Sequence, residues 1–398
     1  MMKLAERTQL IKPSVTLAIA AKAGKLRSDG LDVVNFSAGE PDFDTPEHIK
    51  AAAVEALRKG MTKYTDVRGI EPLRETITQK YQSEYGLAYR KEEVLVSCGA
   101  KHSLYNIFQA VIEPGDEVVI PAPYWVSYSD MVLLAGGAPK LISTNEATGF
   151  RIKPEQLEAA LTPRTRAVVL NSPCNPTGAS YDRDELFAIA HVLEKHDCLI
   201  ISDDIYEKIV YDNFQVHNLV ALSPSLRDRT IIINGVSKTY AMTGWRIGYA
   251  IGPADVISAA GKIQSQSTSN PTSIAQAAAL EAIRGPQDTV TMMVQEFQKR
   301  RDVIVDRLNA IEGIRCLKPQ GAFYVFPTIG SLLGKTGNGK KLGSPCDMAD
   351  YFLEEAKVAV VPGEDFGSHE HVRFSYATSL EDIEKGCKRI HEAVKKLR

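Results

Sequence analysis

The sequence predicts an α/β protein, with a large domain built on a mostly parallel, helix-covered sheet and a smaller α+β domain towards the C-terminus. Short β-branched runs alternate with helix-like segments between residues 93 and 251, which is typical of an α/β domain. Most runs are apolar on both faces, as strands are when helices cover both sides of a parallel sheet. After residue 285 the composition changes to charged helices followed by short apolar runs, which indicates the second domain.

Seven runs are expected to form the large sheet. They are EVLVS (93–97), EVVIP (117–121), KLIST (140–144), RAVVLN (166–171), CLIISD (198–203), TIIIN (230–234) and RIGYAI (246–251). KHSLYNIFQAVI and DELFAIAHVLEKH are two of the intervening helical segments, and AFYVF, VAVVPG and VRFSYA are the short runs of the second domain. We expect an N-terminal arm and part of the small domain over 1–47, the large domain over 48–285 and the C-terminal small domain over 286–398.

The composition limits the classes of protein to which the chain can belong. With 398 residues, 44% hydrophobic and 24% charged, the chain can bury a large core. Its net charge of -2 provides no global field to attract nucleic acid or an anionic membrane. Six cysteines without paired or zinc-type spacing suit free thiols in a reducing compartment, and no metal site is expected. The N-terminal apolar stretch is too short for a membrane span, so we expect a cytoplasmic protein.

Residues with side chains or backbone N–H groups suited to binding a ligand follow four of the predicted strands. They are Gly99, Ala100 and Lys101 at a helix start, Asn171 and Asn175 in a Pro/Gly turn, Asp203 and Tyr206, and Ser237 and Lys238. Any one of these is common as a structural turn or cap. Because parallel sheets bind ligands outside the carboxyl ends of their strands, four such ends together predict a site at this rim.

The chemistry of these residues points to pyridoxal phosphate. A desolvated lysine near Arg246 can be a neutral amine that forms an imine with an aldehyde. Arg246, Ser237 and the backbone N–H groups of a helix start can cradle a phosphate. Asp203 can keep a pyridine nitrogen protonated, which makes the ring an electron sink. Asn175 and Tyr206 can both donate hydrogen bonds to its phenolic oxygen.

Five motifs resemble those of class I, fold-type I pyridoxal-phosphate aminotransferases. They are AGEPDFDTP, NSPCNPTG, SDDIYE, GVSKTYAMTGWRIG and VRFSYA, in order over nearly the whole chain. They are most similar to the bacterial and plant subgroup of aspartate aminotransferases and bifunctional aspartate/prephenate aminotransferases. The resemblance implies that Lys238 binds the cofactor covalently, that Asp203 pairs with the pyridine nitrogen, and that Trp125 stacks on the ring.

The resemblance also implies roles in anion binding. Arg246 would bind the phosphate, with Tyr64 reaching the cofactor of a neighbouring subunit in a homodimer. Gly235 stands where a serine is common, so one phosphate hydrogen bond is expected to be missing. Arg373, aided by the backbone of Gly39, would grip the substrate α-carboxylate, with Trp125 and Asn175 also lining the substrate site.

A second substrate carboxylate needs another cation, because the region 265–273 contains no arginine. By resemblance to the subgroup, Lys101 with Ser14, Thr16 and Lys12 of the N-terminal arm would contact that carboxylate. A flexible ammonium accepts more varied geometries than a guanidinium fork.

We therefore predict reversible amino transfer between L-aspartate and 2-oxoglutarate, giving oxaloacetate and L-glutamate, with prephenate as a second amino acceptor that yields arogenate. The alternatives are an aromatic or alanine aminotransferase and a pyridoxal-phosphate lyase or decarboxylase. A different class, a non-catalytic nucleotide-binding protein, would use GSLLGKTGNGKK (330–341), which is one residue short of a phosphate-binding loop.

Overall fold

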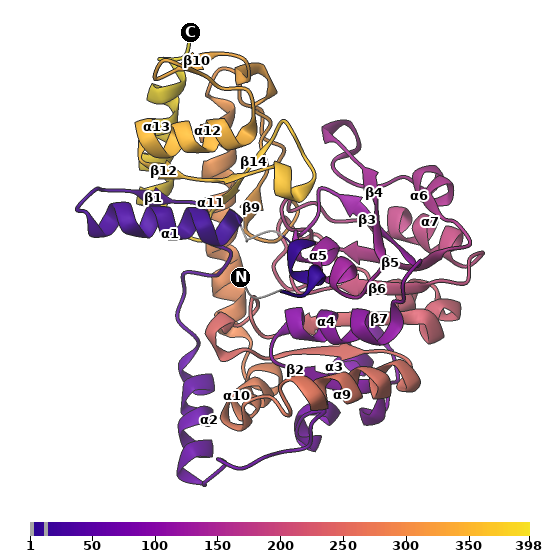
Figure 1. The fold of residues 1–398 in the computed structure, drawn as a ribbon. Helices are drawn as coiled ribbons and strands as arrows, with labels where there is room; N and C mark the ends of the chain where they lie inside the picture. The colour runs from indigo at the N-terminus through magenta and orange to yellow at the C-terminus, as the bar shows by residue number, and fades with distance from the viewer. Residues whose placement is uncertain (1–3, 12–14) are drawn as a thin grey trace.

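A seven-stranded sheet forms the centre of the computed structural model, which describes residues 4–11 and 15–398 (Figure 1). The strand order is β2-β8-β7-β6-β5-β3-β4. The strands are β2 (Val94–Ser97), β3 (Glu117–Ala122), β4 (Ala138–Ser143), β5 (Thr165–Asn171), β6 (Leu199–Asp203), β7 (Thr230–Gly235) and β8 (Gly248–Ile251). Strand β8 alone runs in the opposite direction to the others, so the predicted mostly parallel sheet of seven strands is confirmed.

Helices cover both faces of this sheet, which explains why its strands are apolar on both faces. Ile231 and Ile233 of β7 lie in the core under α4 (Ala100–Val111), α5 (Ser127–Leu134) and α9 (Ala254–Ser267). Ile232, between them, points to the other face and packs with α2 (Glu47–Arg58), α3 (Glu71–Tyr85) and α10 (Ser273–Arg284). Towards β3, that second face is covered by α6 (Pro154–Ala160), α7 (Arg183–Leu193) and α8 (Leu219–Leu222).

A second core joins the C-terminal elements to a strand from the N-terminal region. It contains α11 (Asp288–Asn309), α12 (Pro345–Tyr351), α13 (Leu380–Val394) and the three-stranded sheet of β13 (Val361–Pro362), β14 (Val372–Ser375) and β9 (Tyr324–Val325). Strand β1 (Val34–Asn35) pairs in parallel with β12 (Val358–Ala359), and α1 (Val15–Ser28) lies beside these elements in Figure 1. A short hairpin joins β10 (Thr336–Gly337) and β11 (Lys340–Lys341). The boundaries at residues 47 and 285 stay a prediction.

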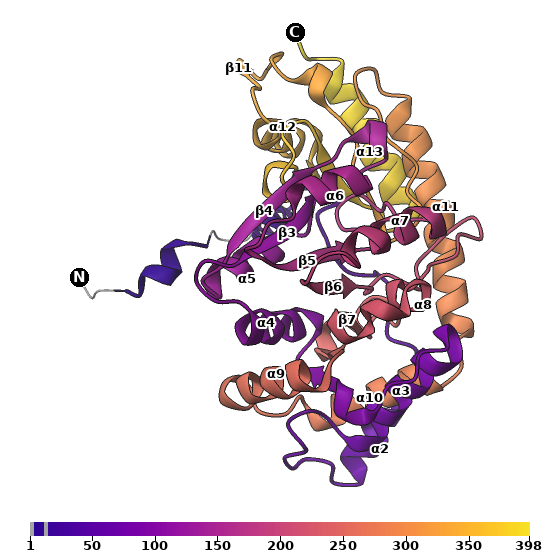
Figure 2. The same cartoon turned by 90° about the vertical axis from the view of Figure 1, so that its right-hand side faces the viewer.

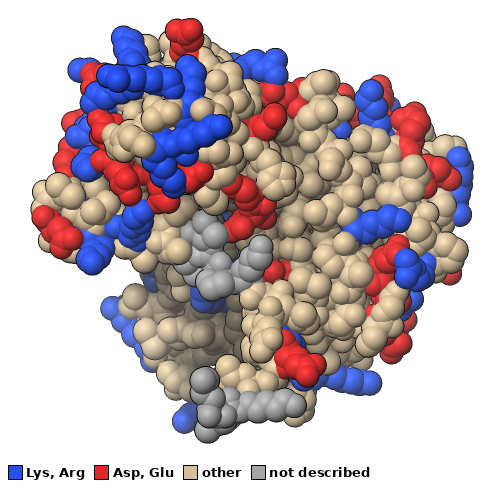
Figure 3. Space-filling model, turned by 45° about the horizontal axis from the view of Figure 1, so that its top comes forward, with Lys and Arg blue, Asp and Glu red and all other residues tan. Residues whose placement is uncertain are grey.

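The first turn of the chain stands away from this body. The 3-10 helix η1 (Glu6–Gln9) projects from the large domain in Figure 2, and Leu4 and Leu10 at its ends are 67% and 52% exposed. Over the face in Figure 3, acidic and basic side chains are interspersed, in keeping with the small net charge. No helix among the described residues has the length and apolarity needed to cross a bilayer.

Candidate active site

The carboxyl ends of β5 and β6 lie side by side and are tied to each other. Asn171 is the register partner of Asp203 and its amide nitrogen donates to the Asp203 carbonyl oxygen at 2.8 Å. The Asn171 side-chain oxygen accepts from the backbone N–H of Asn175 at 3.0 Å. This arrangement brings the turn that carries Asn175 to the end of the neighbouring strand.

Asp203 is a buried carboxylate aimed at the rim. It is 3% exposed, and it accepts hydrogen bonds from the Tyr128 hydroxyl at 2.5 Å and from the backbone N–H of Ile205 at 3.3 Å. Burial raises the pKa of Asp203 to about 6, against the opposing effects of these two hydrogen bonds and of Lys238. Near neutral pH the group is therefore mainly ionised and can hold a positively charged partner.

Lys238 lies four residues beyond Asn234 in the turn that follows β7. Its Nζ donates to the Gly39 carbonyl oxygen at 2.6 Å. Burial lowers the pKa of Lys238 to about 8; Glu40 opposes that shift, while Arg373 adds to it. A lysine with this pKa carries a useful fraction of neutral, nucleophilic amine at physiological pH.

This pKa gives a testable pH dependence for the cofactor-free protein. Only the neutral amine attacks an aldehyde, and the folded-state pKa lies below the ordinary lysine value. The rate at which the protein forms a chromophore with pyridoxal phosphate should therefore rise with pH to a midpoint near 8 and then level off. Stopped-flow absorbance over pH 6–11 measures that rate. A midpoint near that of an ordinary lysine, about 10.4, would contradict the assigned environment.

Arg246 and the start of α4 form a cradle suited to an anion. Gly99, the residue before α4, has φ +90°, and a Cβ there would collide with the Arg246 guanidinium. Arg246 itself donates to the Thr243 carbonyl oxygen at 2.8 Å. The first turn of α4 has no side-chain cap and no acidic residue, so the N–H groups of Ala100 and Lys101 lack partners within the helix. A phosphate group fits this donor set.

Gly235 has no room for a side chain, which is the physical reason that the phosphate-binding serine expected there is missing. A Cβ at Gly235 would lie 2.9 Å from the Gly248 Cα and 3.0 Å from the Ile247 carbonyl oxygen. Ser237, two residues further on, is 7% exposed at the start of the turn. The close approach of β7 and β8 is therefore the physical reason for glycine here.

Arg373 reaches the rim from the second core. It is 2% exposed on β14, and its two terminal nitrogens donate to the Asn175 side-chain oxygen at 3.0 Å and to the Ser37 carbonyl oxygen at 2.9 Å. Its Nε is buried without a hydrogen-bond partner. The guanidinium therefore retains a free donor for a carboxylate.

Aromatic rings line the same region. Trp125 meets Tyr128 edge to face at 5.3 Å, and the Lys101 Nζ lies 4.9 Å from the centre of the Trp125 ring. Burial lowers the pKa of Lys101, and Arg246 acts in the same direction. A cavity of about 440 Å³ adjoins these side chains. Its lining includes Cys98, Lys101, His102, Asp130, Arg246 and Thr268.

Two side chains of the site were missed in the sequence. Tyr128 holds Asp203, and its position three residues after Trp125 was an available signal, since a turn of the chain at the start of α5 brings the two together. The Tyr324 hydroxyl bonds the Tyr206 hydroxyl at 3.0 Å, and the Arg373 guanidinium lies 4.6 Å from the Tyr324 ring centre. No local pattern could have linked Tyr324 to residues this distant in the chain.

Of the remaining predicted residues, one lies away from this cluster and three fall where the structure describes no side chain. Tyr64 lies on the loop between α2 and α3 and is 89% exposed. Lys12 and Ser14 lie outside the described residues. Thr16 is within α1, but its side chain is not among those the structure describes.

The fold and the site define a fold-type I transferase. Residues 31–390 match the family model "Aminotransferase class I and II". An aspartate aminotransferase of Geobacillus stearothermophilus is 50% identical over 98% of both chains, and an aspartate/prephenate aminotransferase of Cereibacter sphaeroides is 52% identical over 97% of both. The crystal structure of the Rhizobium meliloti aspartate aminotransferase superposes with a TM-score of 0.97 at 47% identity, covering 100% of each chain. The chain therefore belongs to the class I and II aminotransferase family.

Proposed function

We propose that this aminotransferase transfers the amino group of L-aspartate to 2-oxoglutarate with pyridoxal phosphate as cofactor, and that prephenate is a second amino acceptor. The observation that carries the proposal is the convergence of Lys238, Asp203 and Arg373, from three distant segments, at one rim. The names of the relatives that are about half identical over nearly their full length support the choice of substrates.

The residues of the rim suit the cofactor. Arg246, Ser237 and the start of α4 would hold its phosphate, Asp203 its ring nitrogen, and Asn175 and Tyr206 its phenolic oxygen. Lys238 would hold its aldehyde carbon. When bound, pyridoxal phosphate supplies an electron sink for the charge left on the substrate α-carbon.

The chain's own groups then orient the substrate and move a proton. Arg373 binds the α-carboxylate through its free Nε donor. The Gly39 backbone lies next to the reacting amine, since the Gly39 carbonyl oxygen accepts from the Lys238 Nζ. Once the substrate amine had replaced it at the cofactor, the freed Lys238 Nζ would take the proton from the α-carbon as general base and would give it, as general acid, to the carbon that had been the cofactor's aldehyde carbon. The low pKa of this amine favours both the uptake of the proton by Lys238 and its release.

Product analysis with the purified protein tests this function. L-aspartate and 2-oxoglutarate should give oxaloacetate and L-glutamate in equal amounts, and prephenate with an amino donor should give arogenate. A lyase or decarboxylase would consume aspartate without forming glutamate. Binding of ATP without amino transfer would instead favour the nucleotide-binding alternative.

Replacing Arg373 by lysine should slow both the reaction with the amino donor and the reaction with the oxo-acid acceptor. Lysine cannot reproduce the planar fork that bridges Asn175, Ser37 and a carboxylate. We expect KM for both substrates to rise and kcat/KM to fall by roughly 10²-fold, the loss expected when a positioned substrate is misaligned. Steady-state kinetics measure this. Arg389→Lys, at an exposed pair with Asp32, is the control, and an equal effect of both substitutions would contradict the role of Arg373.

Removing the Lys101 ammonium should affect dicarboxylic substrates selectively. Lys101→Ala leaves the backbone N–H groups of α4 in place, so cofactor binding should be largely retained. We expect kcat/KM for aspartate to fall by roughly tenfold or more, because a charge-assisted hydrogen bond contributes about 1.5–3 kcal/mol. An aromatic monocarboxylic amino acid, compared by steady-state kinetics on the same variant, should lose much less. Equal losses on both substrates would count against Lys101 as the distal cation.

We extend the proposal to a homodimer in which Tyr64 of each subunit serves the other's phosphate site. An 89% exposed tyrosine on a loop, remote from the hydrogen bonds of its own site, supports such a role. In a mixture of inactive Lys238→Ala and Tyr64→Ala subunits, each mixed dimer would contain one site with both native residues.

Six cysteines present as free thiols agree with a cytoplasmic location.

A further inference from the structure

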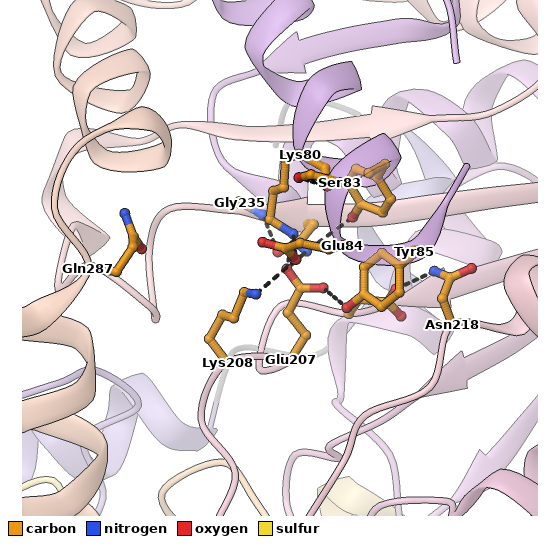
Figure 4. Close-up of polar contacts among 12 residues, drawn as sticks. Lys80, Ser83, Glu84, Tyr85, Glu207, Lys208, Asn218, Gly235 and Gln287 are labelled. Atoms are coloured by element: carbon orange, nitrogen blue, oxygen red, sulfur yellow. Dashed lines mark hydrogen bonds and ion pairs between the residues drawn. The ribbon is translucent and has the colours of Figure 1, made fainter. Parts of the chain in front are cut away.

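A buried polar cluster lies between helix α3 and the strand ends that carry Asp203 and Lys238 (Figure 4). Glu207 is its centre, with Lys80 and Tyr85 from α3 on one side and Asn234 of β7 on the other. We call these four residues the Glu207 cluster. None of them was singled out in the sequence, and none contacts the rim directly in the described hydrogen bonds.

Both oxygens of the Glu207 carboxylate accept hydrogen bonds from these partners. One oxygen accepts from the Lys80 Nζ at 2.6 Å and from the Asn234 amide nitrogen at 2.8 Å, and the other accepts from the Tyr85 hydroxyl at 2.8 Å. The side chains of Glu207 and Lys80 are 3% and 8% exposed. Burial alone would raise the pKa of Glu207, but Lys80 and Lys208 hold it below its ordinary value. Glu207 and Lys80 are therefore both charged, and the three hydrogen bonds fix the orientation of the carboxylate.

The cluster is joined to both strand ends of the site. The Asn234 side-chain oxygen accepts from the backbone N–H of Gly235, so the last residues of β7, just before Ser237 and Lys238, are tied to Glu207. On the other side, Glu207 follows Tyr206 directly, and its N–H donates to the Asp204 carbonyl oxygen at 2.9 Å. One carboxylate thus connects the turn after β6 with the end of β7.

This connection runs through hydrogen bonds and the backbone, and no described hydrogen bond joins Glu207 to the Lys238 amine. The charged groups with the largest effects on the pKa of Lys238 are Glu40, Arg373, Arg246 and Asp203, all outside the Glu207 cluster. Helix α3, packed on β2 and α10, gives Lys80 and Tyr85 a rigid base from which to hold the carboxylate. Outer-shell contacts of this kind orient the groups that do chemistry.

We propose that Glu207 is a positioning residue for the proposed transamination, on which this inference rests: held by Lys80 and Tyr85, it fixes the end of β7 against the Asp203–Tyr206 turn. Its effect on the reaction would then pass through Asn234 to the placement of the Lys238 amine relative to the Asp203 carboxylate. A displacement near 1 Å at such a centre can cost about 10²-fold in rate.

Glu207→Gln and Asn234→Ala in the cofactor-loaded enzyme test the proposal. Asn234→Ala cuts the link to β7 but leaves Glu207 paired with Lys80 and Tyr85, so it keeps the test available if Glu207→Gln fails to fold. Glu93→Gln is the matched control. The Glu93 side chain is 5% exposed and, like Glu207, is paired with a cation, here Arg227. Glu93 precedes β2, so it lies at the amino ends of the parallel strands, away from the rim at their carboxyl ends.

Four measured quantities distinguish a positioning role of Glu207 from an effect on the stability of the fold alone. They are Tm, kcat, KM and the pH midpoint of the bound cofactor's visible absorption band. We expect all three variants to lose thermal stability. Glu207→Gln and Asn234→Ala should also lower kcat by roughly tenfold or more, with KM changed less, as for other outer-shell residues. Their absorption midpoint should move by at least about half a pH unit, since it reports the surroundings of the Lys238 nitrogen.

The inference is overturned if the folded site variants keep the kcat and absorption midpoint of the parent while only Tm falls, as in Glu93→Gln. The inference is also overturned if Glu93→Gln moves the pH midpoint of the absorption band by the same amount as the site variants. Failure of the proposed function looks different, because the parent protein itself would then bind no cofactor and transfer no amino group.

Discussion

Lys238→Ala is expected to reduce amino transfer by roughly 10⁴-fold or more, the largest effect of any single substitution in this chain. The substitution removes both the amine that would hold the cofactor's aldehyde carbon and the base at the substrate α-carbon. Because the Lys238 Nζ makes its described hydrogen bond to one carbonyl oxygen, that of Gly39, the fold should persist. Steady-state assays and the visible absorption of the purified protein measure the two losses.

The exposed Lys262 of α9 offers a matched control. Lys262→Ala removes the same charge and number of atoms but should leave activity and absorption unchanged. Retention of more than a few per cent of activity by Lys238→Ala would contradict the assignment of the amine.

Asp203→Asn should be the second most damaging change, with kcat reduced by roughly 10³-fold, the upper end of the loss for one preorganised electrostatic partner. An amide can keep the hydrogen bond with the Tyr128 hydroxyl, which would then be donated to the Asn oxygen. It cannot keep the negative charge that stabilises a protonated ring nitrogen. Rapid-reaction kinetics of each half-reaction measure the loss at the proton-transfer step.

The neighbouring aspartate provides the comparison. Asp204 is 7% exposed and accepts hydrogen bonds from Ser202 and Asn218. Burial and the neighbouring Glu207 carboxylate raise the pKa of Asp204 well above its ordinary value. Asp204→Asn keeps the size of the side chain at a position that pairs with Ser202 and Asn218, so we expect a much smaller loss of kcat. If both substitutions reduced kcat alike, the ring-nitrogen role of Asp203 would be wrong.

The fold was largely predictable because its signals are local. The apolar runs that form β2 to β8 follow from residue type and alternation, and the rim follows from where the polar residues Asp203 and Lys238 stop those runs. The predicted strand ends were within about two residues of those observed, which is the usual uncertainty of element boundaries.

The contacts between distant segments were not predictable in this way. The pairing of Arg373 with Asn175 and Ser37 depends on how β14 packs against the large domain. The Glu207 cluster depends on the approach of α3 to β7, and a glutamate four residues after Asp203 has no sequence signature of burial. Such contacts are set by packing over long separations, where spacing in the sequence gives no distance.

The most direct test of the central claim is to locate the lysine that carries the cofactor. Borohydride reduction of the protein with bound pyridoxal phosphate makes the bond between amine and aldehyde carbon permanent, and peptide mass spectrometry then identifies the modified residue. We expect a single phosphopyridoxyl group on Lys238. A label on any other lysine, or no label on the cofactor-treated protein, would contradict it.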